Sequence, residues 1–232
     1  MDLSVKNIAM GVVSIILLIV VFRWFMGEKN KISGLNDATK VTKIAASDLA
    51  QNNASNYAYS AWFYINDWSY RYGEPKVILG RLDNDLNPSP SITLGAIENN
   101  LKIESTVYAS SGSSTGTKHT CNVANVPIQK WVNVIVSLYG RTMDVYIDGK
   151  LVRTCVLPGV AKIANNAPVY ITPLGGFSGY TSNVNYYADS LNPQQAYNIY
   201  RKGYGGSSGF SFPYEIKVEF LNDGQEQGSV TI

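Results

Sequence analysis

The chain has 232 residues, which is long enough for one large β domain or two small domains with a sizeable core. Charged residues make up only 16% of the chain and tyrosine occurs 16 times, a composition typical of β sandwiches with polar loops rather than of helical bundles. The formal net charge is +2, which excludes a field strong enough to indicate a nucleic-acid partner.

An apolar run near the start predicts a membrane anchor. Residues 7–22 carry no charge and lie between Lys6 and Arg23. As a helix the run reaches roughly 24 Å, and the apolar residues 24–26 lengthen it toward the roughly 30 Å of a hydrocarbon core. No small-residue cleavage site follows, so we expect an uncleaved anchor over residues 1–27 rather than a secretory signal peptide. The residues assigned to the anchor are Ile8, Val12, Ile15, Leu18, Val21, Phe22, Arg23 and Trp24.

The flanking charges predict the orientation of the anchor. Lys6 and the amino terminus stand on one side, and more cations follow on the other: Arg23, Lys29, Lys31, Lys40 and Lys43. The positive-inside rule therefore places the large domain on the cytosolic side. On that side the glycosylation motif at Asn53 stays unused, and Cys121 and Cys155 need not pair, because strand cysteines in a reducing compartment are more often buried thiols than a disulfide.

Residues 28–56 are polar and are interpreted as a stalk between the anchor and the main domain. Within them, apolar residues recur at helical spacing behind Asn36 or Asp37 as the cap, which predicts a short amphipathic helix over residues 37–49. The residues on the apolar side of that helix are Ala38, Val41, Ile44, Ala45 and Leu49.

Residues 57–203 carry the pattern of an antiparallel β domain. The clearest part is the stretch 131–153, in which strands alternate apolar and polar residues and Asp148-Gly149 supplies a type I′ turn. The predicted strands are 57–65, 76–81, 91–97, 101–107, 118–123, 131–138, 143–147, 150–156, 169–172 and 179–187.

Two elements are predicted near the carboxyl end. Asn192-Pro193 caps a helix over residues 194–202 that Gly203 ends. Residues 204–232 form a Gly/Ser linker and a hairpin tail, with strands at 214–221 and 228–232. The tail lies outside the main pattern, so we expect it to pair with an edge strand of its own domain or of a neighbour.

Five segments, in this order, resemble those of concanavalin A-like, laminin G-type jelly rolls: residues 59–65, 130–136, 143–152 with its Tyr-Ile-Asp-Gly-Lys sequence, 177–187 and 191–200. The resemblance spans about residues 57–203. It implies an all-β fold of two antiparallel sheets packed face to face, here joined to an N-terminal transmembrane helix and one short C-terminal helix.

An anchor that carries such a domain also resembles the membrane-linked minor capsid proteins of large DNA viruses of the chlorella-virus kind. This resemblance implies a non-enzymatic structural protein that links an internal virion membrane to the capsid shell. Its partners would be the lipid bilayer and other capsid proteins, and the contacts are expected from the C-terminal hairpin and the loop at residues 110–116.

Catalysis is not expected from these residues. Glycosidases of this fold need two carboxylates about 5.5 Å apart on one sheet face. The nearest acidic pairs here are Glu98 with Glu104, across a turn, and Asp144 with Asp148, which bracket a hairpin strand. His119 is the only histidine and there are only two cysteines, so the chain has few of the ligands and bases that a zinc site or a Ser-His-Asp triad uses, and neither is expected.

Residues 83–87 resemble the start of a calcium-binding loop. Asp83, Asp85 and Asn87 place oxygens at alternate positions, but Pro88 stands where an EF-hand needs glycine and Leu94 where it needs glutamate. A loop capped by Asx turns explains the pattern equally well. The sequence therefore indicates no cofactor, and these three residues are weak calcium candidates.

Glycan binding is the alternative function, on fold analogy. It needs exposed aromatic faces, and the candidates near loop ends are Tyr70, Tyr72, Tyr108, Tyr180, Tyr186 and Tyr187. Trp62 and Trp131 are expected in the core. A cell-surface lectin would carry a Cys121–Cys155 bridge and a glycosylated Asn53, whereas the capsid protein would carry free thiols.

Overall fold

The computed structural model describes residues 29–108 and 116–205, the backbone strands at 217–222 and 225–231, and two isolated helical positions, Ser14 and Leu18. The rest of the predicted anchor and most of the predicted contact loop at 110–116 lie outside the described residues. No helix within the described part is long and apolar enough to cross a membrane. The chain divides into two compact units, one of residues 25–206 and one of residues 1–24 with 207–232.

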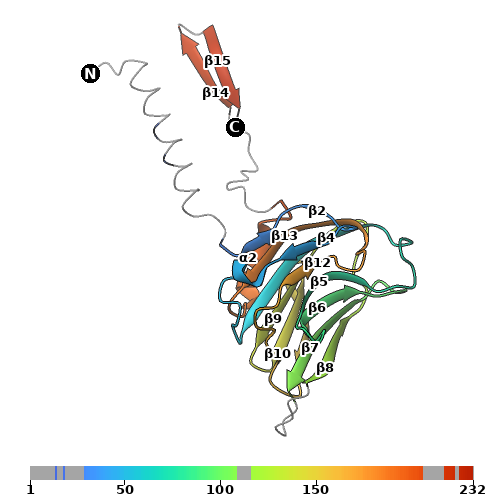
Figure 1. Cartoon of the computed structure of the whole chain (residues 1–232). Coiled ribbons are helices and arrows are strands. Elements are labelled where there is room, and N and C mark those ends of the chain that lie inside the picture. Colours follow the sequence, from blue (N-terminus) through green and yellow to red (C-terminus); the bar gives the residue numbers. More distant parts are fainter. Residues whose placement is uncertain are drawn as a thin grey trace. The chain divides into compact units, whose positions relative to one another are not determined.

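The larger unit is a sandwich of two antiparallel sheets (Figure 1). Sheet A contains β1 (Lys31–Ser33), β2 (Asn36–Asp37), β4 (Tyr57–Asp67), β9 (Trp131–Tyr139), β10 (Thr142–Ile147), β11 (Lys150–Val156) and β13 (Ser178–Tyr187). Sheet B contains β3 (Thr42–Ile44), β5 (Lys76–Leu82), β6 (Pro88–Leu94), β7 (Leu101–Tyr108), β8 (Gly116–Val123) and β12 (Val169–Ile171). The order in sheet A is β1-β13-β4-β9-β10-β11 with β2 also on β13, and in sheet B it is β3-β12-β5-β6-β7-β8.

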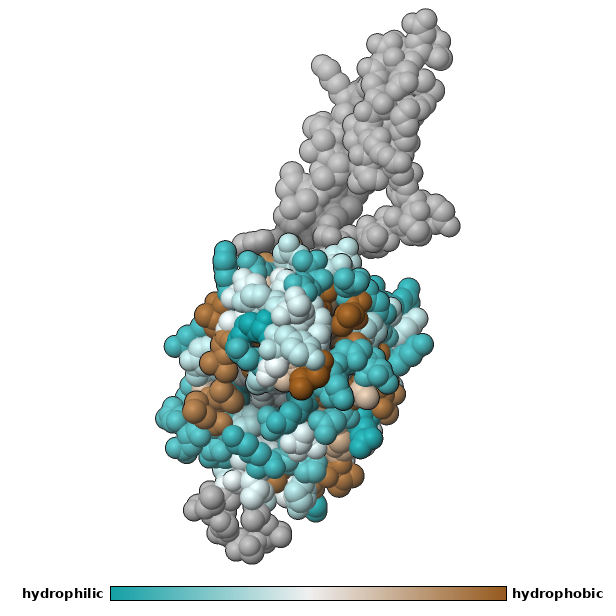
Figure 2. Space-filling view, turned by 90° about the vertical axis from the view of Figure 1, so that its right-hand side faces the viewer, coloured by the Kyte–Doolittle hydropathy of each residue, from teal (hydrophilic) through white to brown (hydrophobic). Residues whose placement is uncertain are grey.

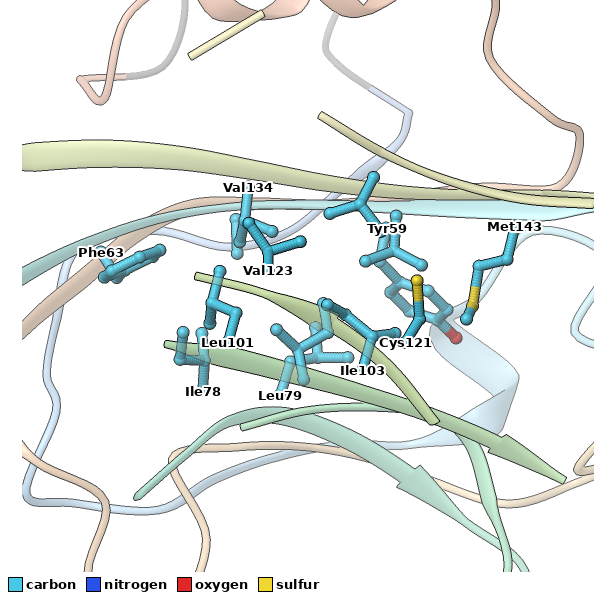
Figure 3. Close-up of a cluster of buried hydrophobic side chains, with 14 of the residues drawn as sticks. Tyr59, Phe63, Ile78, Leu79, Leu101, Ile103, Cys121, Val123, Val134 and Met143 are labelled. Carbon is cyan, nitrogen blue, oxygen red and sulfur yellow. The ribbon is translucent and has the colours of Figure 1, made fainter. Parts of the chain in front are cut away.

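The core lies between the two sheets and consists of alternate residues of the central strands. Tyr59 and Phe63 of β4 and Val134 of β9 point from sheet A toward Ile78 and Leu101 of sheet B (Figure 3). Burial of a large apolar side chain contributes about 1.5–3 kcal/mol. The inner faces of the sheets therefore carry most of the apolar stabilisation, and the predicted face-to-face sandwich is confirmed.

The stretch 131–153 folds as its alternation predicts. β9, β10 and β11 are neighbouring antiparallel strands. Asp148 and Gly149 have φ values of 49° and 73°, the positive values that a type I′ turn requires. A Cβ atom on Gly149 would lie 3.0 Å from the Cβ of Tyr200, so the glycine also lets the C-terminal helix approach the turn.

The predicted C-terminal helix is confirmed as α2 (Pro193–Arg201). The side chain of Asn192 accepts a hydrogen bond from the Gln195 N–H, and the Gln195 side chain accepts one from the Asn192 N–H, both at 2.9 Å. This capping box satisfies two backbone donors at the start of the helix. The helix covers part of the outer face of sheet A, where Ala196 and Ile199 pack on Ile135 and Tyr146.

The predicted helix over residues 37–49 is wrong. These residues and those just before them supply β1, β2, β3 and a short 3-10 helix (Ala46–Asp48). β1 and β2 pair with β13, and β3 pairs with β12, so the segment extends both sheets. Backbone pairing outweighs helical spacing here. In the extended chain Ala38 and Leu49 of the expected apolar stripe are buried in the core, whereas Val41 is 58% exposed. Most of the predicted stalk is therefore part of the sandwich.

The free thiols expected for a capsid protein are not found, and the bridge expected for a lectin is present. Cys121 of β8 and Cys155 of β11 form a disulfide, with their Cα atoms 6.1 Å apart. β8 and β11 are end strands of the two sheets, so the bond ties the sheets together at one side of the sandwich. The sequence places each cysteine on a strand but does not show that these two strands lie opposite each other.

The predicted tail hairpin is confirmed as a separate two-stranded sheet of β14 (Lys217–Asn222) and β15 (Gln225–Thr231). The outer surface of the sandwich is mixed in character. Figure 2 shows hydrophobic residues in small patches among hydrophilic ones on one face of the molecule. Small scattered patches of this kind are normal, so a binding surface has to be identified from the geometry of particular residues.

Candidate aromatic groove

Three aromatic side chains lie in a row on the outer face of sheet A. Tyr180 of β13 is directly opposite Tyr64 of β4, and Tyr64 is directly opposite Trp131 of β9. Directly opposite residues of an antiparallel pair share one face of the sheet. Adjacent strands lie about 4.8 Å apart, so this aromatic row crosses three strands over about 10 Å.

The period of the strands places the row outside the core. Phe63 and Val132, the chain neighbours of Tyr64 and Trp131, point inward and are fully buried. Tyr64 and Trp131 are half-buried, and Tyr180 is 49% exposed. The row therefore offers aromatic surface to solvent on strands whose other face is core.

Tyr204, which follows α2, continues the row beyond Trp131. Its ring lies parallel to the indole within 5°, with the ring centres 4.6 Å apart. The Ser182 hydroxyl donates to the Tyr204 carbonyl at 2.6 Å, and the Asn183 amide donates to the Gly203 carbonyl at 3.1 Å, so this turn is held against β13. Tyr204 thereby covers one face of the indole and fixes its orientation.

A groove of about 400 Å³ lies along the aromatic row. Leu35, Tyr64, Asn66, Trp131 and Tyr180 line it. Leu35 comes from the turn between β1 and β2 and is 67% exposed, so the edge strands that the sequence did not predict supply one wall.

A smaller polar hollow of about 180 Å³ shares two residues with this groove, Asn66 and Tyr180, and also contains Asp37, Thr39 and Ser178. The Asp37 carboxylate accepts hydrogen bonds from the backbone N–H and the hydroxyl of Thr39, at 2.9 and 2.8 Å. These bonds lower the pKa of Asp37, so the carboxylate is ionised at neutral pH.

The two parts together combine flat aromatic surface with an amide and a carboxylate. Ligand sites in proteins are mostly apolar and aromatic, with a few placed polar groups that orient the ligand. A ring with one apolar face and polar groups on its edge meets both requirements. We call Leu35, Asp37, Thr39, Tyr64, Asn66, Trp131, Ser178 and Tyr180 together the aromatic groove.

Only one of the predicted glycan-binding tyrosines lies in the aromatic groove. Tyr180 is that residue, whereas Tyr186 is buried in the core and Tyr187 packs beside α2. Tyr72 and Tyr108 are exposed elsewhere, at 61% and 40%. The remaining candidate is Tyr70, whose hydroxyl donates to the Gly175 carbonyl at 3.3 Å.

The prediction that Trp131 lies in the core is wrong, whereas Trp62 is 5% exposed and packs on Tyr200 rather than between the sheets. The sequence also did not identify Tyr64 and Asn66 as groove residues. The strand alternation carried a signal for the aromatic row: Phe63 and Val132 occupy the inward face, so their neighbours Tyr64 and Trp131 face outward.

The acidic residues considered for hydrolysis do not form a pair. Glu104 lies on β7 with its carboxylate 2.9 Å from the Lys102 ammonium, and Glu98 accepts a hydrogen bond from the Asn100 side chain in the preceding turn. Asp144 accepts a hydrogen bond from the Thr154 hydroxyl at 2.6 Å, and the carboxylate of the remaining residue, Asp148, accepts one from the Asn133 N–H at 2.9 Å.

The candidate calcium loop is closed on itself by hydrogen bonds. The Asp83 carboxylate accepts from the N–H groups of Asp85 and Asn87, at 3.0 and 2.8 Å, and lies 2.7 Å from the Lys162 ammonium. Partial burial works to raise the pKa of Asp83, but the bonds from Lys162 and Asn87 outweigh it and lower the pKa to about 2. A lysine thus stands where a cation would bind, and no cluster of three candidate ligands occurs within the described residues.

Comparisons with known proteins place this fold. Residues 37–196 match the profile of the concanavalin A-like lectin/glucanases superfamily. A search of curated proteins finds no significant match.

Among solved structures, the chain is similar to three neurotoxin domains. One is the binding domain of botulinum neurotoxin DC in complex with rat synaptotagmin II, with a TM-score of 0.53, 15% identity, and coverage of 77% of this chain and 46% of that one. The receptor binding domain of botulinum neurotoxin D has a TM-score of 0.52 and 11% identity, with coverage of 71% of this chain and 43% of that one. The binding domain of botulinum neurotoxin DC in complex with SialylT has a TM-score of 0.51 and 16% identity, with coverage of 70% of this chain and 42% of that one.

This chain spans less than half the length of those neurotoxin domains, and at such identities the likeness concerns the fold alone. The family profile covers well over half of this chain and includes most of both sheets and most of the aromatic groove. The chain therefore belongs to the concanavalin A-like lectin/glucanases superfamily.

Proposed function

We propose that this chain is a non-enzymatic, membrane-tethered binding protein whose aromatic groove takes a sugar ring of a glycan. The supporting observation is the aromatic row beside Asn66 and Asp37. A sugar ring presents C–H groups that pack on aromatic faces and hydroxyls that pair with an amide and a carboxylate. A neurotoxin domain of similar fold was solved in complex with SialylT, which agrees with this class of ligand.

The test is the binding of an oligosaccharide panel to the full chain in detergent micelles, measured by calorimetry and tryptophan fluorescence. Trp131→Ala removes the centre of the aromatic row, and we expect it to weaken binding about tenfold, since an aromatic contact is worth about 0.5–1.5 kcal/mol. Tyr139→Ala is the matched control, because Tyr139 is 67% exposed at the other end of the same strand. Equal loss in both variants, or no binding of any oligosaccharide by the native chain, would contradict the proposal.

The absence of catalysis is part of the proposal and has its own test. Glu104 is paired with Lys102, and Glu98 lies in a separate turn, so neither has a second carboxylate to serve as nucleophile. The native chain is expected to release no product from a β-glucan panel. Product formation that Glu104→Gln abolishes would overturn this part.

A second function, that of a minor capsid protein joining an internal virion membrane to the capsid shell, is favoured by the hairpin of β14 and β15. A two-stranded hairpin is marginally stable alone, and its outer edges have no strand partner within the described part of the chain. On this proposal, detergent treatment of purified particles leaves the protein on the shell, and deletion of residues 214–232 releases it. Recovery of the intact protein in the detergent fraction would argue against this role.

The two functions differ in the side of the membrane that holds the domain. The positive-inside rule favours the cytosolic side, whereas the Cys121–Cys155 bond favours an oxidising compartment. Asn53 is exposed, so on the oxidising side it is accessible for glycosylation. Mass measurement of the native chain before and after reduction and deglycosylation decides: an oxidised, glycosylated chain supports the glycan-binding protein, and free thiols with an unmodified Asn53 support the cytosolic orientation.

A further inference from the structure

β11 is the end strand of sheet A and has a free outer edge. It pairs with β10 on one side, and within residues 29–108 and 116–205 no other strand or loop pairs with its backbone on the other side. The strand has seven residues, Lys150–Val156. Its pairing with β10 shifts register at Val152, between Leu151 and Arg153, so the edge is interrupted there. A free edge is a template for a strand supplied by another chain.

The side chains of β11 distinguish it from the other long edge of the sandwich. Leu151, Val152 and Val156 are 48%, 46% and 69% exposed. β8, the corresponding end strand of sheet B, exposes polar side chains instead, among them Lys118. β11 therefore offers apolar contact surface along its free edge, which β8 does not.

The edge is fixed in place. The Cys121–Cys155 bond ties β11 to β8, and a groove of about 250 Å³ lies between the two edges. Val152 and Arg153 of β11 line this groove together with Val126 and Ile147. A strand added to β11 would thus meet a preformed backbone edge, so little ordering is needed on this side.

Charge points to the kind of strand that fits. Lys150 and Arg153 lie on β11 and are exposed, and neither forms an ion pair with a carboxylate in the described part of the chain. The hairpin of β14 and β15 is of the opposite charge, because residues 217–231 contain one lysine against Glu219, Asp223 and Glu226.

We propose that the free edge of β11 receives the β14–β15 hairpin of a second copy of this chain by strand addition. The hairpin gains a third strand, which a two-stranded ribbon needs for stability, and its acidic residues complement the cations of β11. Hairpin and acceptor edge are different surfaces of the chain, so the contact is heterologous and repeats from copy to copy. It involves no residue of the aromatic groove and goes beyond both proposed functions.

The test is the self-association of the full chain in detergent micelles, measured by sedimentation over a concentration series. Arg153→Glu on the acceptor and Glu219→Lys on the hairpin are each expected to weaken association about tenfold or more, because close charge pairs at interfaces couple strongly. The double variant, with both charges exchanged, should regain most of the native affinity. Lys118→Glu on β8 is the matched control and should leave association unchanged.

A mixing experiment separates contact between copies from contact within one copy. The hairpin of the Arg153→Glu chain matches the native edge of the Glu219→Lys chain, and the exchanged charges of the other two surfaces match as well. A mixture of the two variants should therefore associate nearly as strongly as the native chain, whereas each variant alone should not. A native chain that stays monomeric at all concentrations overturns the proposal, even if its hairpin is protected. So does an equal effect of Lys118→Glu and Arg153→Glu.

Discussion

Loss of the Cys121–Cys155 bond should destabilise the sandwich by an amount that can be worked out from the chain. The two cysteines are 34 residues apart in sequence. In the chain-entropy description, opening a loop of this length lowers the free energy of the unfolded chain by about 4 kcal/mol at 25 °C. A typical domain has only about 5–15 kcal/mol of stability, so reduction should remove a large part of it.

The assay is urea unfolding of the full chain, followed by tryptophan fluorescence with and without reductant. With a slope of about 1–3 kcal/mol/M, the loss should lower the unfolding midpoint by more than about 1 M. The chain carrying both Cys121→Ala and Cys155→Ala is the control, and reductant should not change its midpoint. If reductant leaves the midpoint of the native chain unchanged while both thiols become titratable, the bond does not constrain the unfolded chain and the reasoning is refuted.

Three further predictions concern single positions. The lowered pKa of Asp83 stabilises the fold by at most about 2 kcal/mol. This contribution is complete above about pH 4 and is lost progressively as the pH falls through about 2. Asp83→Asn should therefore flatten this part of the acid-unfolding curve, and an unchanged curve would contradict the pairing with Lys162. Gly179→Ala should lower the melting temperature and disturb the aromatic groove. The φ angle of Gly179 is 150°, and a Cβ atom there would lie 1.9 Å from the Tyr64 carbonyl oxygen. A variant with the native melting temperature and native oligosaccharide binding would refute this geometry. Asn192→Ala should cost about 1 kcal/mol in urea unfolding through loss of the helix cap, and no change would mean that the capping box contributes nothing.

The sequence predicted those parts of the fold in which local pattern and tertiary position agree. β9 and β10 alternate over their whole length, and Asp148-Gly149 has the dihedral angles that its residue types favour. The helix predicted over residues 37–49 is wrong because helical spacing is a local property. Pairing of this segment with β12 and β13 depends instead on where two distant sheet edges lie. Likewise the disulfide depends on the opposition of β8 and β11, which no local pattern contains.

The aromatic groove was hidden for a different reason. Alternation shows that a strand has two faces, but it does not show which part of the outer face a helix covers. α2 covers the region around Ile135 and leaves Trp131 half-exposed four residues earlier on the same strand, so a tryptophan that the pattern favours as core remains at the surface.

In the strands beneath the aromatic groove, one face packs in the core and the opposite face forms the groove. β4 buries Phe63 between the sheets and presents Tyr64 outward, and β9 does the same with Val132 and Trp131. The inward residues carry most of the burial on which the sandwich depends, and the outward row is only partly buried. The groove can therefore change its residues, and with them its ligand, while the sandwich keeps its fold. For this reason membership of the superfamily establishes the architecture, and the ligand has to be argued from Tyr180, the row it begins and the polar groups beside it.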